Sequence, residues 1–231
     1  MIDTSIVIPA YKPVELLKTC VQSIMDTADL NKIEIVVVCN GSDKESGEYV
    51  LSLQNSACIR LVWYTEALGF TKAANIGLRL AKGPYCILMN TDVKMLNFKE
   101  RHFWVDKMVN PMRENKNVAV TGAADMYFLH RLYFPFFCVG LNKAMLEKFN
   151  YLDEIFSPGY GEDIDFCFKS TLAGHELVLI NNRIADDENK RYTSDFPIYH
   201  QGRASFKEQG AGLAERGGEI IYRRYAIKPL E

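Results

Sequence analysis

Residues 85–92, YCILMNTD, combine the two features that decide the fold of this 231-residue chain. The run Tyr85–Met89 is apolar throughout, which is typical of a strand that is covered on both faces of a sheet. The run stops at Asn90-Thr91-Asp92, so a carboxylate directly follows a buried strand. Asp92 is therefore either a turn former or a ligand for something positively charged.

Strand and helix patterns alternate through the first half of the chain. Strands are predicted at Ser5–Pro9, Ile33–Val38 and Ile59–Tyr64, and helices at Pro13–Thr27 and Gly69–Lys82. Apolar strands that alternate with helices predict an α/β fold with an open, wound, mostly parallel sheet. In such sheets ligands bind beyond the carboxyl ends of the strands. The residues expected on this shared rim are Pro9, Ala10, Tyr11, Asn40, Glu66, Asn90, Thr91 and Asp92.

The second half of the chain has a less regular pattern. Helices are predicted at Phe98–Asn115, Asn142–Phe149 and Glu162–Ala173, and strands at Val118–Gly122 and Glu176–Ile180. The aromatic stretch Tyr127–Gly140 contains Pro135, which suits an edge strand or a pocket wall. Residues 185–197 are polar and without periodicity, which predicts a mobile loop.

Composition excludes several classes of protein. The net charge of −2 provides no basic field, so nucleic acid is not expected as a partner. No apolar stretch approaches the roughly 20 residues of a membrane-spanning helix, and the first residues run straight into a strand, which argues against a signal peptide. The six cysteines form no CxxC pair and have mostly apolar neighbours. Buried, reduced thiols in a cytoplasmic protein are therefore expected.

Two further features are candidates for chemistry. Residues 161–165, GEDID, place three carboxylates at a predicted helix start. They are either an acidic helix start that the dipole favours or part of a site, and Asp163 and Asp165 should face different ways. His200 is either a structural residue or, if Asp92 holds a metal ion, a further metal ligand.

Four stretches carry a resemblance to a known family. They are SIVIPAYKP, IEIVVVCNGSDKES, ALGFTKAANIGLRLAKGPYCILMNTDV and YLDEIFSPGYGEDIDFCFKSTLAGHEL. Together they resemble family 2 glycosyltransferases of the GT-A fold, and they look most similar to the rhamnosyltransferase-like branch. The resemblance implies a Rossmann-like sheet with helices on both faces in a single domain over residues 1–231. Residues 1–95 would bind the nucleotide-sugar, residues 96–182 would form the acceptor and catalytic half, and residues 183–231 would form a lid and tail.

The resemblance also implies a role for each matching residue. The catalytic base would be Asp163, and the metal ligands would be Asp92 and His200. Donor binding would involve Pro9, Ala10, Tyr11, Asn40, Glu66, Gly69, Asn75, Asn90 and Thr91. Glu162 and Asp165 would lie on the acceptor side. Cys39 stands where many family members carry Asp, so the base of the nucleotide stays open.

The implied activity is metal-dependent, inverting transfer of a hexose or deoxyhexose, as in polysaccharide biosynthesis. The donor would be a UDP-, GDP- or dTDP-sugar, and the acceptor a hydroxyl of a glycan or a lipid-linked sugar. Mn²⁺ or Mg²⁺ suits a carboxylate, an imidazole and phosphate oxygens. The alternatives are a sugar nucleotidyltransferase and a non-catalytic carbohydrate-binding domain. The first normally has a glycine- and basic-rich loop where this chain has PAYKPVE, and the second has no need of a base.

Overall fold

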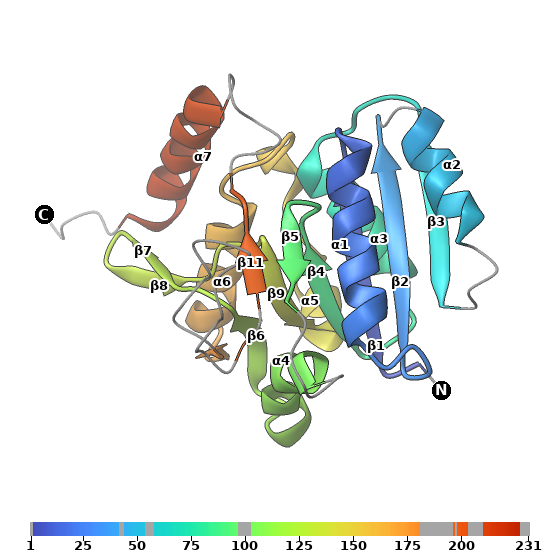
Figure 1. The fold of residues 1–231 in the computed structure, drawn as a ribbon. Helices are drawn as coiled ribbons and strands as arrows, with labels where there is room; N and C mark the ends of the chain where they lie inside the picture. The colour runs from blue at the N-terminus through green and yellow to red at the C-terminus, as the bar shows by residue number, and fades with distance from the viewer. Residues whose placement is uncertain are drawn as a thin grey trace, which may run out of the picture.

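Seven strands form the central sheet of the computed structural model, in the order β10-β6-β9-β4-β1-β2-β3 (Figure 1). The structure describes residues 2–41, 44–53, 58–96, 103–180, 196, 198–202 and 210–226. The strands of this sheet are β1 (Thr4–Ala10), β2 (Ile33–Asn40), β3 (Ile59–Tyr64), β4 (Tyr85–Met89), β6 (Val118–Gly122), β9 (Cys138–Asn142) and β10 (Glu176–Leu179).

Parallel pairing dominates this sheet, as the sequence predicted. Strand β1 pairs in parallel with β2 and with β4, and β2 pairs in parallel with β3. Every residue of β1, β2 and β4 is buried, which accounts for the unbroken apolar runs in the sequence. Strand β9 runs antiparallel to both of its neighbours, β4 and β6, so the sheet is mixed.

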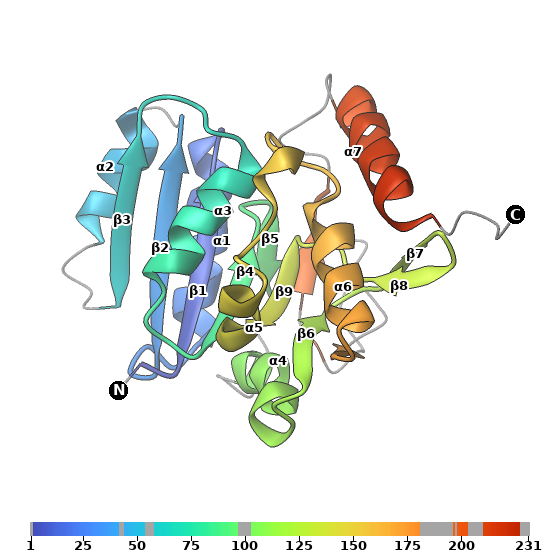
Figure 2. The same cartoon turned by 180° about the vertical axis from the view of Figure 1, so that it is seen from behind.

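Helices cover both faces of the sheet. Helices α1, α2 and α4 pack on one face, where α1 is in front in Figure 1, and α3, α5 and α6 pack on the other, which Figure 2 shows. The helices are α1 (Val14–Thr27), α2 (Lys44–Ser52), α3 (Phe70–Leu80), α4 (Phe103–Glu114), α5 (Lys143–Lys148), α6 (Glu162–Leu172) and α7 (Gly210–Tyr225), with a 3₁₀ turn η1 (Glu154–Phe156). The predicted single-domain α/β fold is confirmed.

Two small antiparallel pairs complete the structure. Strand β5 (Val93–Met95) pairs with β11 (Ile198–His200), and β7 (Met126–Phe128) pairs with β8 (Arg131–Tyr133). The aromatic stretch 127–140 is therefore not one edge strand, because it spans most of a hairpin, a connecting loop and the start of β9. The stretch ends inside the sheet, because β9 lies between β6 and β4. Pro135 precedes β9, so it removes none of the backbone donors of that strand.

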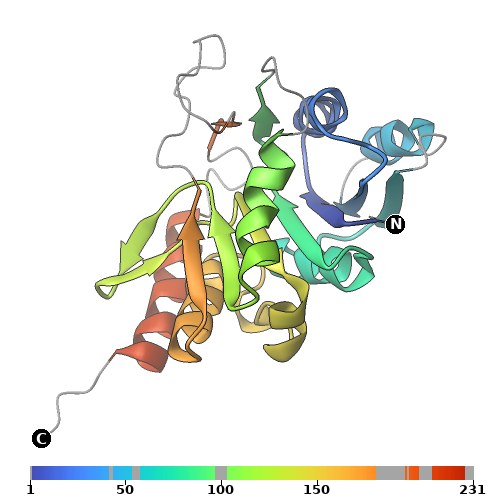
Figure 3. The same ribbon diagram turned by 90° about the horizontal axis from the view of Figure 1, so that it is seen from below.

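The C-terminal helix α7 was not expected from the sequence. It lies beside α6 and near the β7–β8 hairpin, as Figure 3 shows from below. Its 16 residues include four glycines, which are poor helix formers. The predicted mobile loop 185–197 falls outside the described residues except for Phe196, which is buried.

The six cysteines are all buried, as expected, and none of them forms a disulfide. In the parts of the chain that the structure describes, no helix combines the length and apolarity needed to cross a membrane.

Helix α3 approaches the sheet closely at Gly77. A Cβ placed there would overlap with Val7 Cγ1 and lie 3.2 Å from Val38 Cγ2. Both valines belong to central strands whose side chains cannot move without disturbing the core. The close contact between helix and sheet therefore depends on the missing side chain.

We expect Gly77→Ala to lower the free energy of unfolding by about 1–2 kcal/mol, because overpacking outweighs the gain in helix propensity. Gly212→Ala in α7 is the matched control, since its Cβ would meet nothing within 4 Å. It should raise stability by roughly 0.5–1 kcal/mol. Denaturant unfolding of both variants checks this. If both variants changed the free energy of unfolding equally and with the same sign, the close approach of α3 to the sheet would be contradicted.

Candidate active site

A cavity of about 1070 Å³ lies where the carboxyl ends of β1, β2 and β4 meet. Its walls also include the loop before α3, the start of α6, and residues of β11 and α7. Six of the residues predicted to bind the donor line it, namely Pro9, Tyr11, Asn40, Gly69, Asn90 and Thr91. The predicted metal ligands Asp92 and His200 line it too, as do Glu162 and Asp163.

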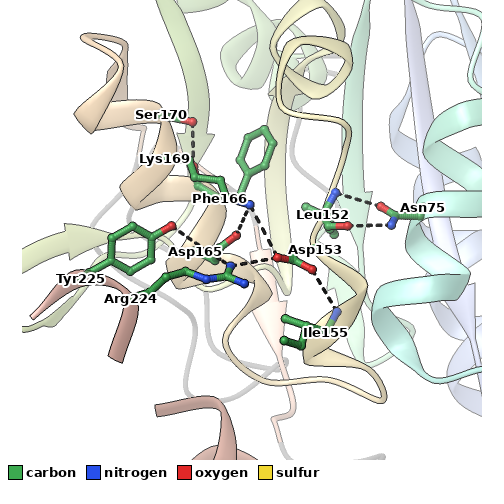
Figure 4. A network of polar contacts seen from close by, with 10 residues as sticks. All are labelled: Asn75, Leu152, Asp153, Ile155, Asp165, Phe166, Lys169, Ser170, Arg224 and Tyr225. Carbon is green, nitrogen blue, oxygen red and sulfur yellow. Dashed lines mark hydrogen bonds and ion pairs between the residues drawn. The ribbon is translucent and has the colours of Figure 1, made fainter. Parts of the chain in front are cut away.

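Three other predicted donor residues are not part of the cavity wall. Ala10 is fully buried, and Glu66 is exposed. Asn75 is buried in α3, where its amide bonds to both backbone groups of Leu152, at 2.8 and 3.0 Å (Figure 4). It also donates to Glu154 Oε1 at 3.0 Å. Asn75 therefore supports the segment that forms one wall of the cavity.

Asp92 and His200 lie side by side at the rim although 108 positions separate them in the chain. Asp92 follows β4 in a turn, and the β5–β11 pairing places His200 opposite Val93. Gln201 N donates to the Asp92 carbonyl at 3.0 Å. His200 Nε2 lies 3.4 Å from Asp92 Oδ1, without the geometry of a hydrogen bond.

The imidazole of His200 also stacks on an aromatic ring. The rings of His200 and Phe137 stack with 4.1 Å between their centroids and 11° between their planes. The backbone of Phe137 is itself fixed, because its carbonyl accepts from Asn90 N at 2.8 Å. The turn that carries Asp92 and the ring that supports His200 therefore belong to one rigid unit.

The donor atoms at this place suit a hard divalent cation. Asp92 Oδ1 and Asn90 Oδ1 are both buried and without a hydrogen-bond partner among the described residues. A buried carboxylate oxygen without a partner is costly unless a cation or a ligand satisfies it. In the described part of the chain, no three His, Cys, Asp or Glu side chains are arranged so that they could hold a metal ion together. The protein would thus supply only part of the coordination of a metal ion.

The first turn of α6 presents two carboxyl groups to the cavity. Gly161, with φ of +107°, begins the helix without a side-chain cap. Asp163 Oδ1 accepts from Ile164 N at 2.8 Å, and part of the Asp163 side chain is open to the cavity. Glu162 is 5% exposed, and its Oε2 has no hydrogen-bond partner in the described structure.

Burial changes the acidity of both groups. It raises the pKa of the Glu162 carboxyl well above its usual range, and the charge of Asp163 raises it further. Burial also raises the pKa of Asp163, while backbone N–H groups such as that of Ile164 oppose part of the change. Glu162 therefore holds a proton more firmly than Asp163, which leaves Asp163 as the better candidate for an ionised base at neutral pH.

The third acidic residue of the cluster, Asp165, faces away from the cavity and toward α7 (Figure 4). It is 1% exposed, and its carboxylate accepts from Arg224 Nη1 and from the Tyr225 hydroxyl, both at 2.7 Å. Lys169 Nζ lies 2.6 Å from its other oxygen. Arg224 also pairs with Asp153 at 2.9 Å. Asp165 thus joins α6 to α7 rather than lining the predicted acceptor side.

Hydrogen bonds join the loop between β3 and α3 to the end of β2 and to the segment that precedes α6. Asn40 Oδ1 accepts from Leu68 N at 2.5 Å. Ser157 Oγ donates to the Leu68 carbonyl at 3.0 Å, and Phe70 N donates to the Pro158 carbonyl at 2.5 Å. Gly69 between them has φ of +85°, and a Cβ there would lie 2.5 Å from Pro158 Cα. A side chain at Gly69 would therefore separate the two walls.

Several cavity residues were not found by sequence reasoning. They are Lys72, Glu154, Ile155, Tyr160 and Arg216, among others. Phe137 lies in the aromatic stretch for which a pocket wall was one of the two alternatives. Arg216 could have been found only through α7, whose glycines conceal the helical pattern.

Comparison with known proteins agrees with this architecture. Residues 5–137 match the model of the family described as Glycosyl transferase family 2. A curated relative, Glycosyltransferase GlyG of Streptococcus pneumoniae serotype 4 (strain ATCC BAA-334 / TIGR4), is 32% identical over 90 residues, which are 38% of this chain and 29% of the relative.

Two solved structures have the same fold. The mannosyltransferase PcManGT from Pyrobaculum calidifontis, in complex with GDP-Man and Mn²⁺, has a TM-score of 0.61 at 16% identity, over 76% of this chain and 54% of its own. The 1–349 fragment of S. aureus TarS, in complex with UDP-GlcNAc, has a TM-score of 0.60 at 15% identity, over 84% of this chain and 62% of its own. These likenesses confirm the predicted GT-A fold.

This chain spans less than two thirds of the length of each of these relatives. The rhamnosyltransferase-like branch stays a prediction. The family match itself covers more than half of the 231 residues and includes β1, β2 and β4, the strands whose ends build the rim. By that match, the chain belongs to glycosyl transferase family 2.

Proposed function

We propose that the chain is a metal-dependent glycosyltransferase that moves a sugar from a nucleotide-sugar to a hydroxyl of a glycan or a lipid-linked sugar, with inversion. The observation that carries this proposal is the meeting of two sites at one cavity. Asp92 and His200 form the first site, and Glu162 and Asp163 form the second. A binding module needs no buried acid–base pair beside a cation site.

The cavity is large enough for a nucleotide-sugar. Pockets for one drug-sized ligand measure about 300–1,000 Å³, and this cavity measures about 1070 Å³. Tyr11 and Asn40 lie at the ends of β1 and β2, where wound sheets bind nucleotides. The solved structures of PcManGT and TarS contain GDP-Man and UDP-GlcNAc, which supports a sugar linked to a nucleoside diphosphate as donor.

Asp92 and His200 would hold the divalent cation. The buried oxygens of Asp92 and Asn90 that accept no hydrogen bond from the described residues fit an oxygen-seeking ion, and PcManGT was solved with Mn²⁺. When bound, Mn²⁺ or Mg²⁺ offsets the negative charge that develops on the diphosphate as the sugar departs. The stacking of His200 on Phe137 fixes the orientation of the imidazole before any ligand arrives.

Asp163 would act as the general base. Its carboxylate takes the proton of the acceptor hydroxyl while the acceptor oxygen attacks the anomeric carbon of the donor. The hydrogen bond from Ile164 N fixes Oδ1, so the carboxylate keeps one orientation. A single displacement on the face opposite to the leaving group inverts the anomeric centre. Glu162, protonated beside it, would donate a hydrogen bond to a substrate oxygen.

We place the protein in the cytoplasm. The support is chemical, because six buried cysteines without a disulfide are typical of a reducing compartment.

Asp92→Ala should abolish metal-dependent binding of the donor and leave the fold intact, since the side chain lies at the rim rather than in the core. Calorimetric titration of UDP-, GDP- and dTDP-sugars with Mn²⁺ measures this. For the wild type, the matching donor at about 100 times its Kd should add ~2.7 kcal/mol of stability. Asp26→Ala, which removes an exposed carboxylate of α1, is the control. Wild-type binding by Asp92→Ala would show the metal assignment to be wrong.

Asp163→Asn keeps the shape of the side chain and cannot accept a proton. We expect donor affinity close to the wild-type value and turnover reduced by ~10²–10⁴. Asp165→Asn should act on stability instead, because it removes the charge that Arg224 and Lys169 pair with. Single-turnover kinetics together with thermal melting separates the two effects. If Asp165→Asn lost turnover at full stability and Asp163→Asn did not, the assignment of Asp163 as the base would be wrong.

The pH profile should reflect the burial of Asp163. A base works in its ionised form, so activity is present above its pKa and is lost as the pH falls through it. Since burial raises the pKa of Asp163, the acidic limb of kcat/KM should lie above the usual range of an aspartate. Glu162→Gln should keep this limb, because the amide resembles the protonated carboxyl. An acidic limb of kcat/KM in the ordinary pKa range of an aspartate would contradict the assignment of the buried Asp163 as the base.

A further inference from the structure

An apolar shelf, formed by Ile155 and Tyr160, lies on the cavity wall beside α6. The two residues are 48% and 36% exposed, and both line the cavity. Neither has a part in the chemistry described above. Large apolar side chains that stay exposed within a cavity are typical of a surface that a ligand covers.

The backbone holds Tyr160 in an uncommon conformation. Its φ of +73° lies in the left-handed region, where a bulky non-glycine residue is rare. Gly161 follows with φ of +107° and leads directly into Glu162 and Asp163. Such conformations persist where the surrounding structure enforces them, and they occur mostly at functional sites. The turn fixes Tyr160 three residues before the base.

Helix α7 supports the shelf from outside the cavity. The Arg216 guanidinium donates to the carbonyl oxygens of Ile155 and Ser157, at 2.7 and 3.0 Å. Gly217 packs against the backbone of Tyr160, where a Cβ would lie 2.9 Å from the Tyr160 carbonyl carbon and closer still to its oxygen. The position of the shelf therefore depends on contacts between the C-terminal helix and the segment before α6.

Carboxyl groups line the same cavity as this apolar surface. Glu154 and Glu162 line the same cavity, and Asp163 follows directly. A sugar ring matches this arrangement, because its C–H face packs on an aromatic ring while its hydroxyls donate to carboxyl oxygens. A hydrocarbon chain would leave those carboxyl groups desolvated without partners.

We propose that the shelf is the acceptor subsite and that the acceptor unit that reacts is a sugar ring stacked on Tyr160. The inference rests on the proposed function, whose acceptor class it narrows. The acceptor oxygen forms its bond to the anomeric carbon as the bond from that carbon to the diphosphate breaks. The hydroxyl proton passes to Asp163, and the electron pair of the broken bond leaves with the nucleoside diphosphate.

The test compares release of nucleoside diphosphate in water with release in the presence of methyl glycosides of glucose, galactose, mannose, N-acetylglucosamine and rhamnose. At least one glycoside should raise the rate above hydrolysis in the wild type. Tyr160→Gly removes the ring and suits the left-handed backbone conformation, and thermal melting of the variant checks that it is folded. It should raise the acceptor KM about 5–10-fold and lower the ratio of transfer to hydrolysis similarly.

Two matched variants complete the experiment. Tyr160→Phe keeps the ring and should retain the wild-type acceptor KM. Tyr222→Ala removes a 60% exposed tyrosine of α7 that does not line the cavity, and it should change neither rate. A wild-type acceptor KM in Tyr160→Gly would overturn the inference, as would hydrolysis that no glycoside accelerates. Absence of hydrolysis with every donor and metal would instead overturn the proposed function itself.

Discussion

Backbone hydrogen bonds in parallel register join β1 to β2 on one side and to β4 on the other, and the site depends on this pairing. Parallel strands end at the same edge, so Tyr11, Asn40 and Asp92 reach one rim although they are far apart in the chain. Because both faces of the three strands are buried, a shift in register would expose apolar side chains and is strongly disfavoured. The position of the rim is thus fixed by the core.

The sequence predicts this half of the molecule well for the same reason. Strands that are buried on both faces leave unbroken apolar runs, and their ends could be located to within one or two residues. Asp92 and Asn40 could be placed at the rim without any tertiary information. Asn75 could not be assigned correctly by position alone, since its amide turns inward to the backbone of Leu152 and supports the wall from behind.

Prediction becomes weaker where the fold depends on contacts between distant segments. Strand β9 could not be recognised as a central strand, because nothing local shows that Cys138–Asn142 inserts antiparallel between β4 and β6. The three-residue strands β5 and β11 carry no periodicity, yet their pairing brings His200 to Asp92. Helical spacing predicted that Asp163 and Asp165 face different ways, but it could not show which of them is structural. That follows only from the contacts of Asp165 with cations and a hydroxyl on α6 and α7.

The clamp between Asp165 and the pair Arg224 and Tyr225 has a consequence for the order in which the protein is made. Chains emerge from the ribosome N-terminus first, so α6 with its acidic pair is synthesised about 60 residues before the helix that secures it. The rim of β1, β2 and β4 can form earlier, whereas His200 and α7 are synthesised after α6. A nascent chain can therefore assemble the strands of the rim while the turn that carries Glu162 and Asp163 is still unsecured, and α6 gains this support only as Arg224 and Tyr225 dock.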